Sequence, residues 1–361
     1  MVVLRVSDEI KILSYKGEYV VNFDSGGIDQ LNQQPIENAI YIVDQNIAQI
    51  YDNRLGNILN SEKVLIIEAT EENKSLAQFP AYVDSLVGLN VRRGQKLVAI
   101  GGGIIQDITC FLAATMMRGL PWMFYPTTLL AQSDSCIGSK SSINSGEVKN
   151  ILGTFTPPEQ VVIDVDFLQT LEEKDIFSGI GEMIKVHAID SPASFDLMAQ
   201  SYEKIRNNRL EMEKFINRSL LIKKRLIEID EFDLGPRNVM NYGHSFGHAI
   251  ESATNFAIPH GIAVTIGMDI ANYVASKLRV STDHHFERMH GVMDKNSQTY
   301  RHVHIDVNAL MLALSKDKKN SATQLRLILP DQDGCIHIGL YDNNDKLLDI
   351  INDYFAIYGG Q

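Results

Sequence analysis

Residues 96–107 read KLVAIGGGIIQD, a largely apolar run that leads through three glycines into a helical pattern. The residues before the glycines have the character of a strand that is buried on both faces of a parallel sheet. Glycine at such a turn lets the backbone approach a phosphate closely, and the N-terminus of the following helix attracts the anion. The stretch is not the G-x-G-x-x-G fingerprint, so a plain strand-to-helix turn is the alternative interpretation.

The surrounding sequence repeats this alternation of short apolar runs and helical patterns. The other segments that we expect to form strands are 39–43, 64–67, 122–125 and 161–163. The segments that we expect to form helices are 76–89, 104–118 and 128–132. Such an alternation is typical of a parallel sheet covered by helices on both faces. Residues 1–172 are therefore predicted to form a Rossmann-like α/β domain that binds a nucleotide.

After about Leu171 helical patterns dominate. The expected helices are 175–188, 195–207, 210–228, 244–253, 262–278 and 344–358, with one short strand at 324–329. We therefore predict a second, mostly helical domain over residues 173–361, and a fold class of α/β plus α.

The composition excludes several classes of protein. The 361 residues include 45% hydrophobic and 22% charged side chains, as in ordinary globular proteins. A formal net charge of -12 argues against nucleic acid or an anionic membrane as a general partner. Three widely spaced cysteines argue against a disulfide framework and against a cysteine zinc site. Because the N-terminus lacks signal-peptide features and the longest apolar stretch is about half a membrane span, we expect a cytoplasmic protein.

A histidine-rich segment carries a metal-binding pattern. Residues 241–248 read NYGHSFGH, and His260 follows after a turn. His244 and His248 are four residues apart and share one face of a helix. Two histidines and a carboxylate form a common catalytic zinc set that leaves positions open for substrate, and Glu182 is the candidate carboxylate. The alternative is that these histidines are structural or solvated.

Several other polar residues have two interpretations. Asp44 ends a predicted strand and suits a ribose-hydroxyl acceptor, although a strand-end aspartate commonly caps a turn. Basic residues next to glycine, serine or asparagine suit an anion pocket, although each alone is more typical of a solvated surface. The basic candidates are Arg118, Lys140, Lys149, Lys223, Arg237, Lys318 and Lys319, of which all except Lys223 and Lys318 adjoin such a residue. Five further histidines are predicted to lie on a solvated surface, namely His284, His285, His290, His302 and His304.

Together these motifs resemble the dehydroquinate synthase family of sugar phosphate cyclases. The resemblance extends from about Asp44 to Leu329. The matching segments are 101–107 (GGGIIQD), 118–119, 126–135 (PTTLLAQSDS), 138–140, 149–150, 181–185 (GEMIK), 235–237, 241–248, 260–261 and 317–319 (DKK). The joint match is far more specific than any single motif.

The resemblance implies a role for each matching position. Glu182, His244 and His260 would bind zinc, or cobalt in its place. The residues that hold NAD would be Asp44, Glu71, Lys74, Gly102, Gly103, Asp107, Thr127, Thr128, Asp134, Lys140, Lys149 and Thr170. The substrate-binding residues would be Arg118, Lys140, Asn150, Lys223, Arg237 and Lys319, with Lys318 as the alternative to Lys319. The catalytic residues would be His248, Lys185, Asp134, Lys140 and Asn241.

The resemblance also implies a reaction. It is the conversion of the seven-carbon keto-acid phosphate of the shikimate pathway to 3-dehydroquinate, a step in aromatic amino acid biosynthesis. The enzyme would be a phosphate lyase that oxidises the substrate transiently with NAD and closes a carbocycle. Its partners would be a small phosphorylated sugar acid or sugar and a second copy of the chain, in a homodimer.

Several positions depart from the family pattern and leave the substrate open, among them the loop 145–148 and Asp233, which stands where a glutamate is usual. Gln106 and Ser139 replace glycines, Pro236 replaces a leucine, and Ile262 replaces a glutamate. One alternative is a cyclase for another substrate, such as sedoheptulose 7-phosphate or glucose 6-phosphate. Others are a metal-dependent polyol dehydrogenase and a non-catalytic binding relative. Retention of both Lys223 and Arg237 favours a carboxylated substrate.

Overall fold

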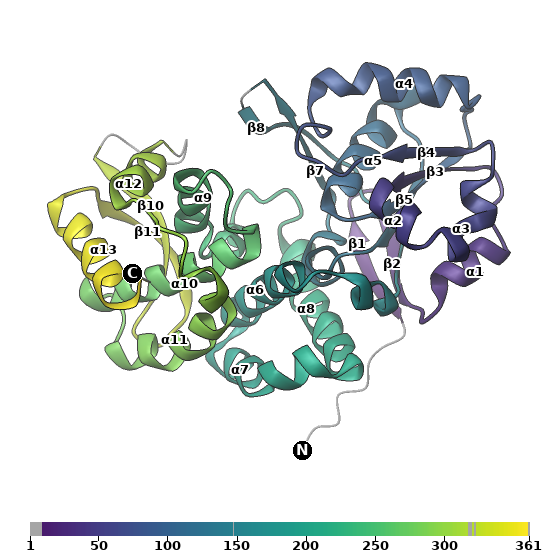
Figure 1. The fold of residues 1–361 in the computed structure, drawn as a ribbon. Coiled ribbons are helices and arrows are strands. Elements are labelled where there is room, and N and C mark those ends of the chain that lie inside the picture. Colours follow the sequence, from purple (N-terminus) through teal and green to yellow (C-terminus); the bar gives the residue numbers. More distant parts are fainter. Residues whose placement is uncertain (1–8, 147, 317–319, 321–322, 360–361) are drawn as a thin grey trace. The chain divides into compact units, whose positions relative to one another are not determined.

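The computed structural model describes residues 9–146, 148–316, 320 and 323–359 (Figure 1). The chain divides into two compact units. The first consists of Met1–Leu171 and Ile216–Asp233, and the second of Glu172–Phe215 and Leu234–Gln361. The first unit thus takes in a later segment of the chain as well as its N-terminal part.

A seven-stranded sheet forms the centre of the first unit, in the order β1-β2-β9-β6-β5-β3-β4. The strands are β1 (Glu9–Ser14), β2 (Gly17–Phe23), β3 (Ala39–Asp44), β4 (Val64–Ile67), β5 (Lys96–Gly101), β6 (Trp122–Pro126) and β9 (Gln160–Ile163). All neighbouring pairs are parallel except β1 and β2. Every residue of β3 and β6 is buried, which explains their continuously apolar sequences.

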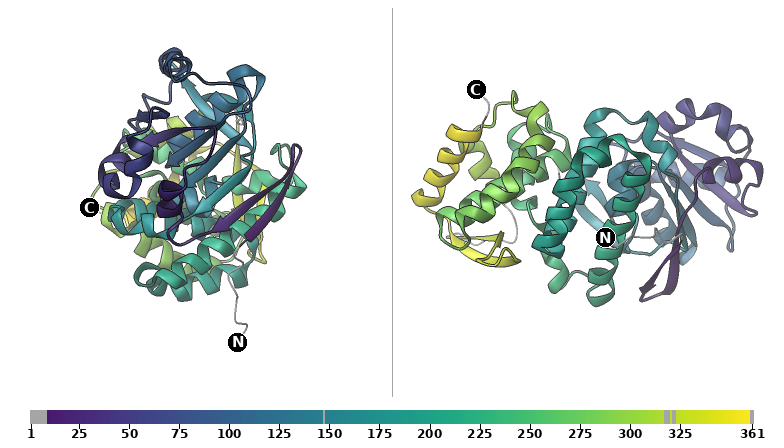
Figure 2. Two further views of the ribbon diagram at one scale, coloured as in Figure 1. Left: turned by 90° about the vertical axis from the view of Figure 1, so that its right-hand side faces the viewer. Right: turned by 90° about the horizontal axis from the view of Figure 1, so that it is seen from below.

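The hairpin of β1 and β2 lies at one edge of this sheet (Figure 2). Residues along β1 alternate between exposed and buried, because the strand contributes only one face to the core. The polar residues at alternate positions interrupt the apolar run. For this reason the sequence pattern does not predict a strand here.

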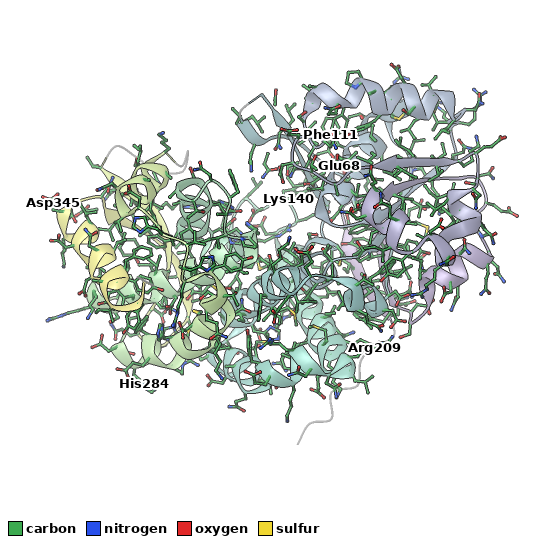
Figure 3. All side chains as sticks on the ribbon, in the orientation of Figure 1. Glu68, Phe111, Lys140, Arg209, His284 and Asp345 are labelled. Carbon is green, nitrogen blue, oxygen red and sulfur yellow. The ribbon has the colours of Figure 1, made fainter. Side chains whose placement is uncertain are left out.

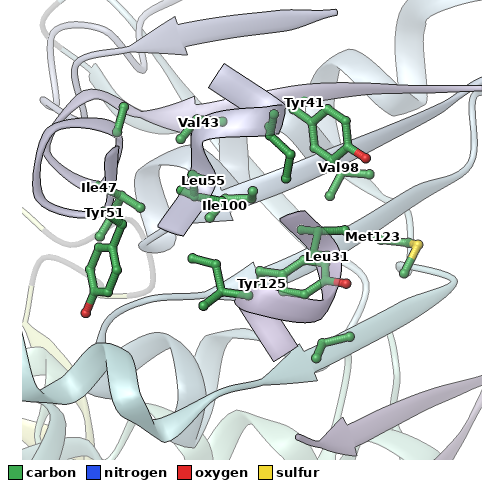
Figure 4. Close-up of a cluster of buried hydrophobic side chains, with 14 of the residues drawn as sticks. Leu31, Tyr41, Val43, Ile47, Tyr51, Leu55, Val98, Ile100, Met123 and Tyr125 are labelled. Carbon is green, nitrogen blue, oxygen red and sulfur yellow. The ribbon is translucent and has the colours of Figure 1, made fainter. Parts of the chain in front are cut away.

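Helices cover the sheet. They are α1 (Gly27–Gln33), α2 (Gln45–Ile50), α3 (Asp52–Leu59), α4 (Phe79–Gly88) and α5 (Gly103–Thr115), with short 3-10 turns at Leu76–Gln78, Met116–Arg118 and Val165–Thr170. One core cluster packs Tyr41, Val98 and Tyr125 of the central strands together with Leu31 of α1 and Leu55 of α3 (Figure 4). Helix α5 packs on β3, β5 and β6, so the glycine turn that precedes it is held against the sheet.

Between β6 and β9 the chain leaves the sheet. It forms a π-helical turn (Ala131–Ser135) and then a hairpin of β7 (Lys140–Ser145) and β8 (Val148–Phe155). Lys140 lies at the start of β7 (Figure 3). Strand β8 is largely exposed, so its sequence carries no buried-strand pattern.

The second unit is mostly helical. Its helices are α6 (Glu173–Asp190), α7 (Pro192–Asn207), the first part of α8 (Arg209–Ile229), α9 (His244–Ala253), α10 (His260–Lys277), α11 (Asp283–Ser297), α12 (Val307–Ser315) and α13 (Asp345–Tyr358). Short 3-10 turns occur at Pro236–Asn241 (η5) and Gln298–Tyr300 (η6), and β10 (Gln324–Pro330) pairs with β11 (Ile336–Asp342). Helix α10 packs against α6, α9, α11 and α13, and it is buried along most of its length.

The predicted fold class is confirmed: a parallel sheet with helices is followed by a mostly helical region. All five predicted strands of the sheet and the predicted helices at 175–188, 244–253 and 344–358 occur within one or two residues of their expected bounds. Helices α1, α2, α3, α11 and α12 were not predicted. Among the described residues, no helix combines the length and the apolar character that crossing a membrane requires.

The prediction that five histidines form a solvated surface is wrong for His285 and only partly right for His290, which is half-buried. His285 is buried, and His290 Nδ1 lies 2.8 Å from the buried Asp269 Oδ2. Asp269 and Tyr358, which contact His290, come from α10 and α13, so the local sequence did not reveal this environment. His284, at the start of α11, is exposed as predicted (Figure 3).

Candidate active site

Three polar side chains from three helices converge in the second unit. Glu182 comes from α6, His244 from the N-terminus of α9 and His260 from the N-terminus of α10. Glu182 Oε1 lies 3.8 Å from His244 Nε2 and 3.4 Å from His260 Nε2. Although this oxygen is buried, it has no hydrogen-bond partner of normal geometry among the described residues. A buried, unsatisfied carboxylate oxygen facing two imidazole nitrogens is a strong mark of a cation site.

The other ring nitrogen of each histidine is already engaged. His244 Nδ1 lies 3.3 Å from the carbonyl oxygen of Tyr242, and His260 Nδ1 lies 3.2 Å from Glu251 Oε1. Such contacts fix the orientation of an imidazole and leave its Nε2 directed at a metal. Both Nε2 atoms therefore face Glu182.

Glycines allow these helices to approach closely enough. A Cβ atom at Gly181 would lie 2.2 Å from the carbonyl oxygen of Gly261, and one at Gly261 would lie 1.9 Å from that of Ser178. Gly243 has a φ of 76° and no room for a side chain beside Met268. Each of these glycines directly precedes or follows one of the three converging residues. The glycines thus determine the spacing of the site.

The charges around the site favour metal-binding forms of two residues. Burial opposes ionisation of Glu182, but Lys185 and the two histidines hold its pKa well below the usual value. Burial and the charge of Lys185 lower the pKa of His244 well below its usual value. Burial also acts to lower the pKa of His260, but Glu182 and Glu251 raise it to about 10. Glu182 is thus kept as an ionised carboxylate and His244 as a neutral imidazole, which are the forms that bind metals. The raised pKa of His260 shows that the carboxylates beside it favour positive charge at this position.

His248 lies beside this trio. One ligand atom each from His244, His248 and His260 lie within 4.8 Å of one another, so these three histidines form a second candidate metal set. His248 is exposed, whereas Glu182 is buried and directed at both other histidines. We favour Glu182 as the third ligand, because a buried carboxylate oxygen without a partner is costly unless a cation binds it. Both donor sets fit zinc or cobalt.

In the first unit, the carboxyl ends of adjacent strands bring together residues expected to hold NAD. Thr127, after β6, donates its backbone N–H to the carbonyl oxygen of Gly101, at the end of β5. A Cβ atom at Gly102 would lie 3.0 Å from the side chain of Thr128, so only glycine fits there comfortably. This edge of a parallel sheet is where such folds bind nucleotides. Asp44, at the end of β3, accepts a hydrogen bond from the backbone N–H of Asn46 and so caps α2.

Further expected NAD and substrate residues form one hydrogen-bonded network. Lys74 Nζ lies 3.1 Å from Asp107 Oδ2 and donates a 2.9 Å hydrogen bond to Asn150 Oδ1. Ser142 donates to both Asp107 and Asn150, and Asn144 donates to Glu71. The network links α5 to the hairpin of β7 and β8.

Two basic residues expected to bind substrate have acidic partners within the first unit. Lys223, in the later part of α8, has its Nζ 2.6 Å from Asp134 Oδ1. The same Nζ donates a hydrogen bond to the backbone carbonyl oxygen of Asp134. Lys140 pairs with Asp233. A bound anion would therefore compete with a carboxylate for each ammonium group.

The departure at Gln106 has a structural role. Its side chain donates a 2.6 Å hydrogen bond to the carbonyl of Ser135 and accepts one of 2.6 Å from the Ser135 hydroxyl. The pair joins α5 to the π-helical turn that carries Asp134. Ile262, the departure after His260 and Gly261, is fully buried.

Other predicted site residues lie apart from these groups. Arg118 is exposed beyond the C-terminal end of α5, whereas Gly102 and Gly103 lie at its N-terminal end, about 20 Å away along the helix. Thr170 contacts the hydroxyl of Tyr51 at 2.9 Å.

The remaining predicted residues occupy varied positions. Lys149 is exposed on β8. Arg237 is buried and Asn241 is partly buried, both on η5 before α9. Lys318 and Lys319 lie outside the described residues.

Three contributors to these groups were not predicted from the sequence. Ser142 and Asn144 carry no motif of their own. Glu251, which contacts His260, lies seven residues after His244 on the same face of α9, so helical periodicity offered a usable signal.

Several solved structures share the fold of this chain. One of them is 2-deoxy-scyllo-inosose synthase, crystallised in complex with carbaglucose-6-phosphate, NAD+ and Co2+. Its TM-score is 0.81 and its sequence identity is 22%, over 98% of this chain and 100% of that chain. The chain also resembles ValA, the 2-epi-5-epi-valiolone synthase of Streptomyces hygroscopicus subsp. jinggangensis 5008, with NAD+ and Zn2+ bound, with a TM-score of 0.81 and 24% identity over 98% and 99% of the two chains. A 1,3-propanediol oxidoreductase shares the fold less closely, with a TM-score of 0.64 and 14% identity over 93% and 97%.

Sequence comparisons identify the family. The 3-dehydroquinate synthase N-terminal family matches residues 64–178, and the C-terminal family matches residues 179–320. The 3-dehydroquinate synthase of Dehalococcoides mccartyi (strain ATCC BAA-2266 / KCTC 15142 / 195) is 35% identical over 305 residues, which is 83% of this chain and 85% of that protein. That of Thermodesulfovibrio yellowstonii is 29% identical over 96% of this chain and 100% of its own length. The chain belongs to the 3-dehydroquinate synthase family, whose members cyclise a sugar phosphate.

Proposed function

We propose that this protein is a 3-dehydroquinate synthase that uses NAD and a divalent metal, zinc or cobalt. Its substrate would be the seven-carbon keto-acid phosphate of the shikimate pathway. The observation that carries the proposal is the convergence of Glu182, His244 and His260 in a chain that shares 35% identity with named 3-dehydroquinate synthases. The cofactors are proposed because related folds were crystallised with NAD+ and with Co2+ or Zn2+.

The residues of the second unit would handle metal and proton. When bound, the metal and NAD supply Lewis acidity and reversible hydride acceptance. Glu182, His244 and His260 would hold the metal, and Lys185 keeps Glu182 ionised through its contact with Oε2. His248, exposed beside them, would accept and return the proton of the substrate hydroxyl.

Other residues would hold the anionic parts of the substrate. We assign the carboxylate to Lys223 and Arg237, which are both buried and cationic. We assign the phosphate to Lys140, Asn150 and His248, and the remaining polar contacts to Lys185, Asn241 and Lys319. The family resemblance assigns the phosphate to Arg118 as well, although Arg118 lies apart from the other groups, beyond the end of α5. NAD would be held by the strand-end residues Asp44, Gly102, Gly103, Thr127 and Thr128, by Glu71, Lys74 and Asp107, and by Asp134, Lys140, Lys149 and Thr170.

A second candidate is a cyclase for another sugar phosphate, such as sedoheptulose 7-phosphate or glucose 6-phosphate. This second candidate is supported by the similarity of the fold to two such cyclases, each with a TM-score of 0.81. A metal-dependent polyol dehydrogenase is less well supported, because an unphosphorylated polyol requires no phosphate-binding lysines.

One assay separates these functions. The metal-loaded protein and NAD are incubated in turn with the keto-acid phosphate, sedoheptulose 7-phosphate, glucose 6-phosphate and a polyol, while phosphate and NADH are both followed. The proposal requires phosphate release from the keto-acid phosphate without accumulation of NADH. Turnover of a neutral sugar phosphate alone would establish the second candidate, and NADH accumulation on the polyol would establish a dehydrogenase.

We further propose that the protein works in the cytoplasm as a homodimer. The proposal rests on the family resemblance alone. Sedimentation equilibrium of the purified protein tests the homodimer, because a single species with the mass of one chain would exclude it.

A further inference from the structure

A separate cavity lies within the second unit. It has a volume of about 580 Å³ and is lined by α10, α11, η6, residues 301–308 and the C-terminal half of α13. None of the residues assigned above to metal, NAD or substrate lines it. Its size falls within the range of about 300–1,000 Å³ that is typical of small-molecule sites.

A buried carboxylate lines this cavity. Asp269, on α10, is 3% exposed. Its Oδ2 accepts a 2.7 Å hydrogen bond from the Tyr354 hydroxyl and lies 2.8 Å from His290 Nδ1. Its Oδ1 is buried and has no hydrogen-bond partner in the part of the chain that the structure describes. A buried carboxylate oxygen without a partner is costly, and this one belongs to a residue that lines the cavity.

The cavity is also rich in aromatic rings. Tyr300, Tyr354, Phe355 and Tyr358 all line it. The ring of Tyr358 lies 4.4 Å from that of His290 and 5.5 Å from that of Tyr354, measured between centroids. Aromatic faces attract cations and stack on other rings.

The charges of the lining favour a cation over an anion. The lining contains the carboxylates of Asp269, Asp294 and Asp306, against one guanidinium, that of Arg301, and the imidazoles of His290 and His304. Arg301 pairs with Asp294, and Asp306 accepts hydrogen bonds from backbone N–H groups at the start of α12. Asp269 is therefore the lining carboxylate that retains an unused buried oxygen.

We propose that this cavity is a second ligand site, which binds a small organic ammonium ion with an aromatic body. The ammonium group would donate to Asp269, and the body would pack among the tyrosines. This inference does not depend on the proposed enzymatic function, since no residue is shared between the two sites.

Calorimetric titration of the whole protein with 2-phenylethylammonium tests the proposal. The matched anionic probe is 3-phenylpropionate, which has a similar size and the same ring. We expect saturable binding of the ammonium and at least tenfold weaker binding of the carboxylate. Asp269→Asn should raise the Kd of the ammonium by about tenfold or more, because a charge-assisted hydrogen bond is lost. Tyr358→Ala should raise it by about three- to tenfold.

Asp349→Asn is the matched control, because Asp349 is exposed on α13 and does not line the cavity. This variant should bind the ammonium like the wild type. The proposal is overturned if the wild type does not bind 2-phenylethylammonium, if both probes bind equally, or if Asp269→Asn binds it unchanged. Should Asp269→Asn fail to fold, as judged by its melting curve, unchanged binding by Tyr358→Ala overturns the proposal instead.

Discussion

At the residue scale, the two oxygens of Glu182 have different tasks. Oε2 contacts the ammonium group of Lys185, and Oε1 faces His244 and His260. Lys185 therefore keeps the carboxylate ionised without occupying the oxygen that faces the histidines. Glu251 supports the site from the other side of His260.

These tasks lead to a prediction for metal binding. Glu182→Ala should abolish stoichiometric metal binding, and Glu251→Gln should weaken it by roughly 10–100-fold, as for other residues that orient a metal ligand. His248→Ala should retain the metal. Metal content after dialysis, measured by mass spectrometry, checks all three variants. If Glu182→Ala keeps its metal and His248→Ala loses it, the three-histidine set is the metal site.

Arg237 allows a second prediction at this scale. It is a buried cation on η5, and we assign it to the substrate carboxylate. Arg237→Ala should raise KM for the keto-acid phosphate by roughly 10- to 150-fold, because a charge-assisted contact contributes about 1.5–3 kcal/mol. Steady-state kinetics measure this effect, and Arg92→Ala, at an exposed position, is the control. An unchanged kcat/KM would mean that Arg237 does not touch the substrate.

At the element scale, close helix packing builds the candidate metal site. Helices α6 and α10 meet where Gly181 faces Gly261, directly beside Glu182 and His260. A larger residue at that crossing must push the helices apart. The distance between the two polar side chains would increase with them.

Gly181→Ala should therefore lower both stability and metal affinity. The added methyl group would lie 2.2 Å from a carbonyl oxygen, and such overpacking typically costs about 1–3 kcal/mol or more. Gly291→Ala is the control, because Gly291 lies in α11 with nothing near its Cβ position. The control should leave metal binding intact and stabilise the protein by up to about 1 kcal/mol. Urea unfolding and metal titration measure both effects, and a Gly181→Ala protein with wild-type metal affinity would contradict the prediction.

The elements differ in how well the sequence predicts them. Strands β3, β5 and β6 are buried on both faces, so each had to be continuously apolar, and each was predicted. Strands β1 and β8 expose many of their residues and were missed. Helix α11 was missed because its polar and histidine-rich sequence conceals the residues that it buries.

At the scale of the whole molecule, the first unit depends on a distant segment. Residues 216–233 group with the sheet rather than with the neighbouring helices. Glu228 accepts a hydrogen bond from the backbone of Leu13, Glu231 accepts from Ser14 and Tyr15, and Lys223 pairs with Asp134. These contacts connect the segment to the edge hairpin and to the π-helical turn.

We therefore expect the fragment 1–172 to be unstable by itself. Circular dichroism should show a weak or absent cooperative thermal transition for this fragment, since it lacks those partners. Addition of a synthetic peptide of residues 209–233 should restore the transition, whereas a peptide of the same composition in scrambled order should not. A cooperative transition of the fragment alone, unaffected by either peptide, would show that the segment is dispensable.

The sequence by itself determined the parallel sheet, its following helices, the glycine turn and the identity of the metal-binding candidates. It did so because burial on both faces and tight turns restrict which residues are tolerated locally. Only the tertiary structure decided which of the candidates meet, that Glu251 contacts His260, that residues 216–233 join the first unit, and that Asp269 lines a second cavity. Most of these depend on contacts between residues far apart in the chain, which local residue patterns do not encode, and Glu251 and His260, nine residues apart, meet only because α9 and α10 pack together.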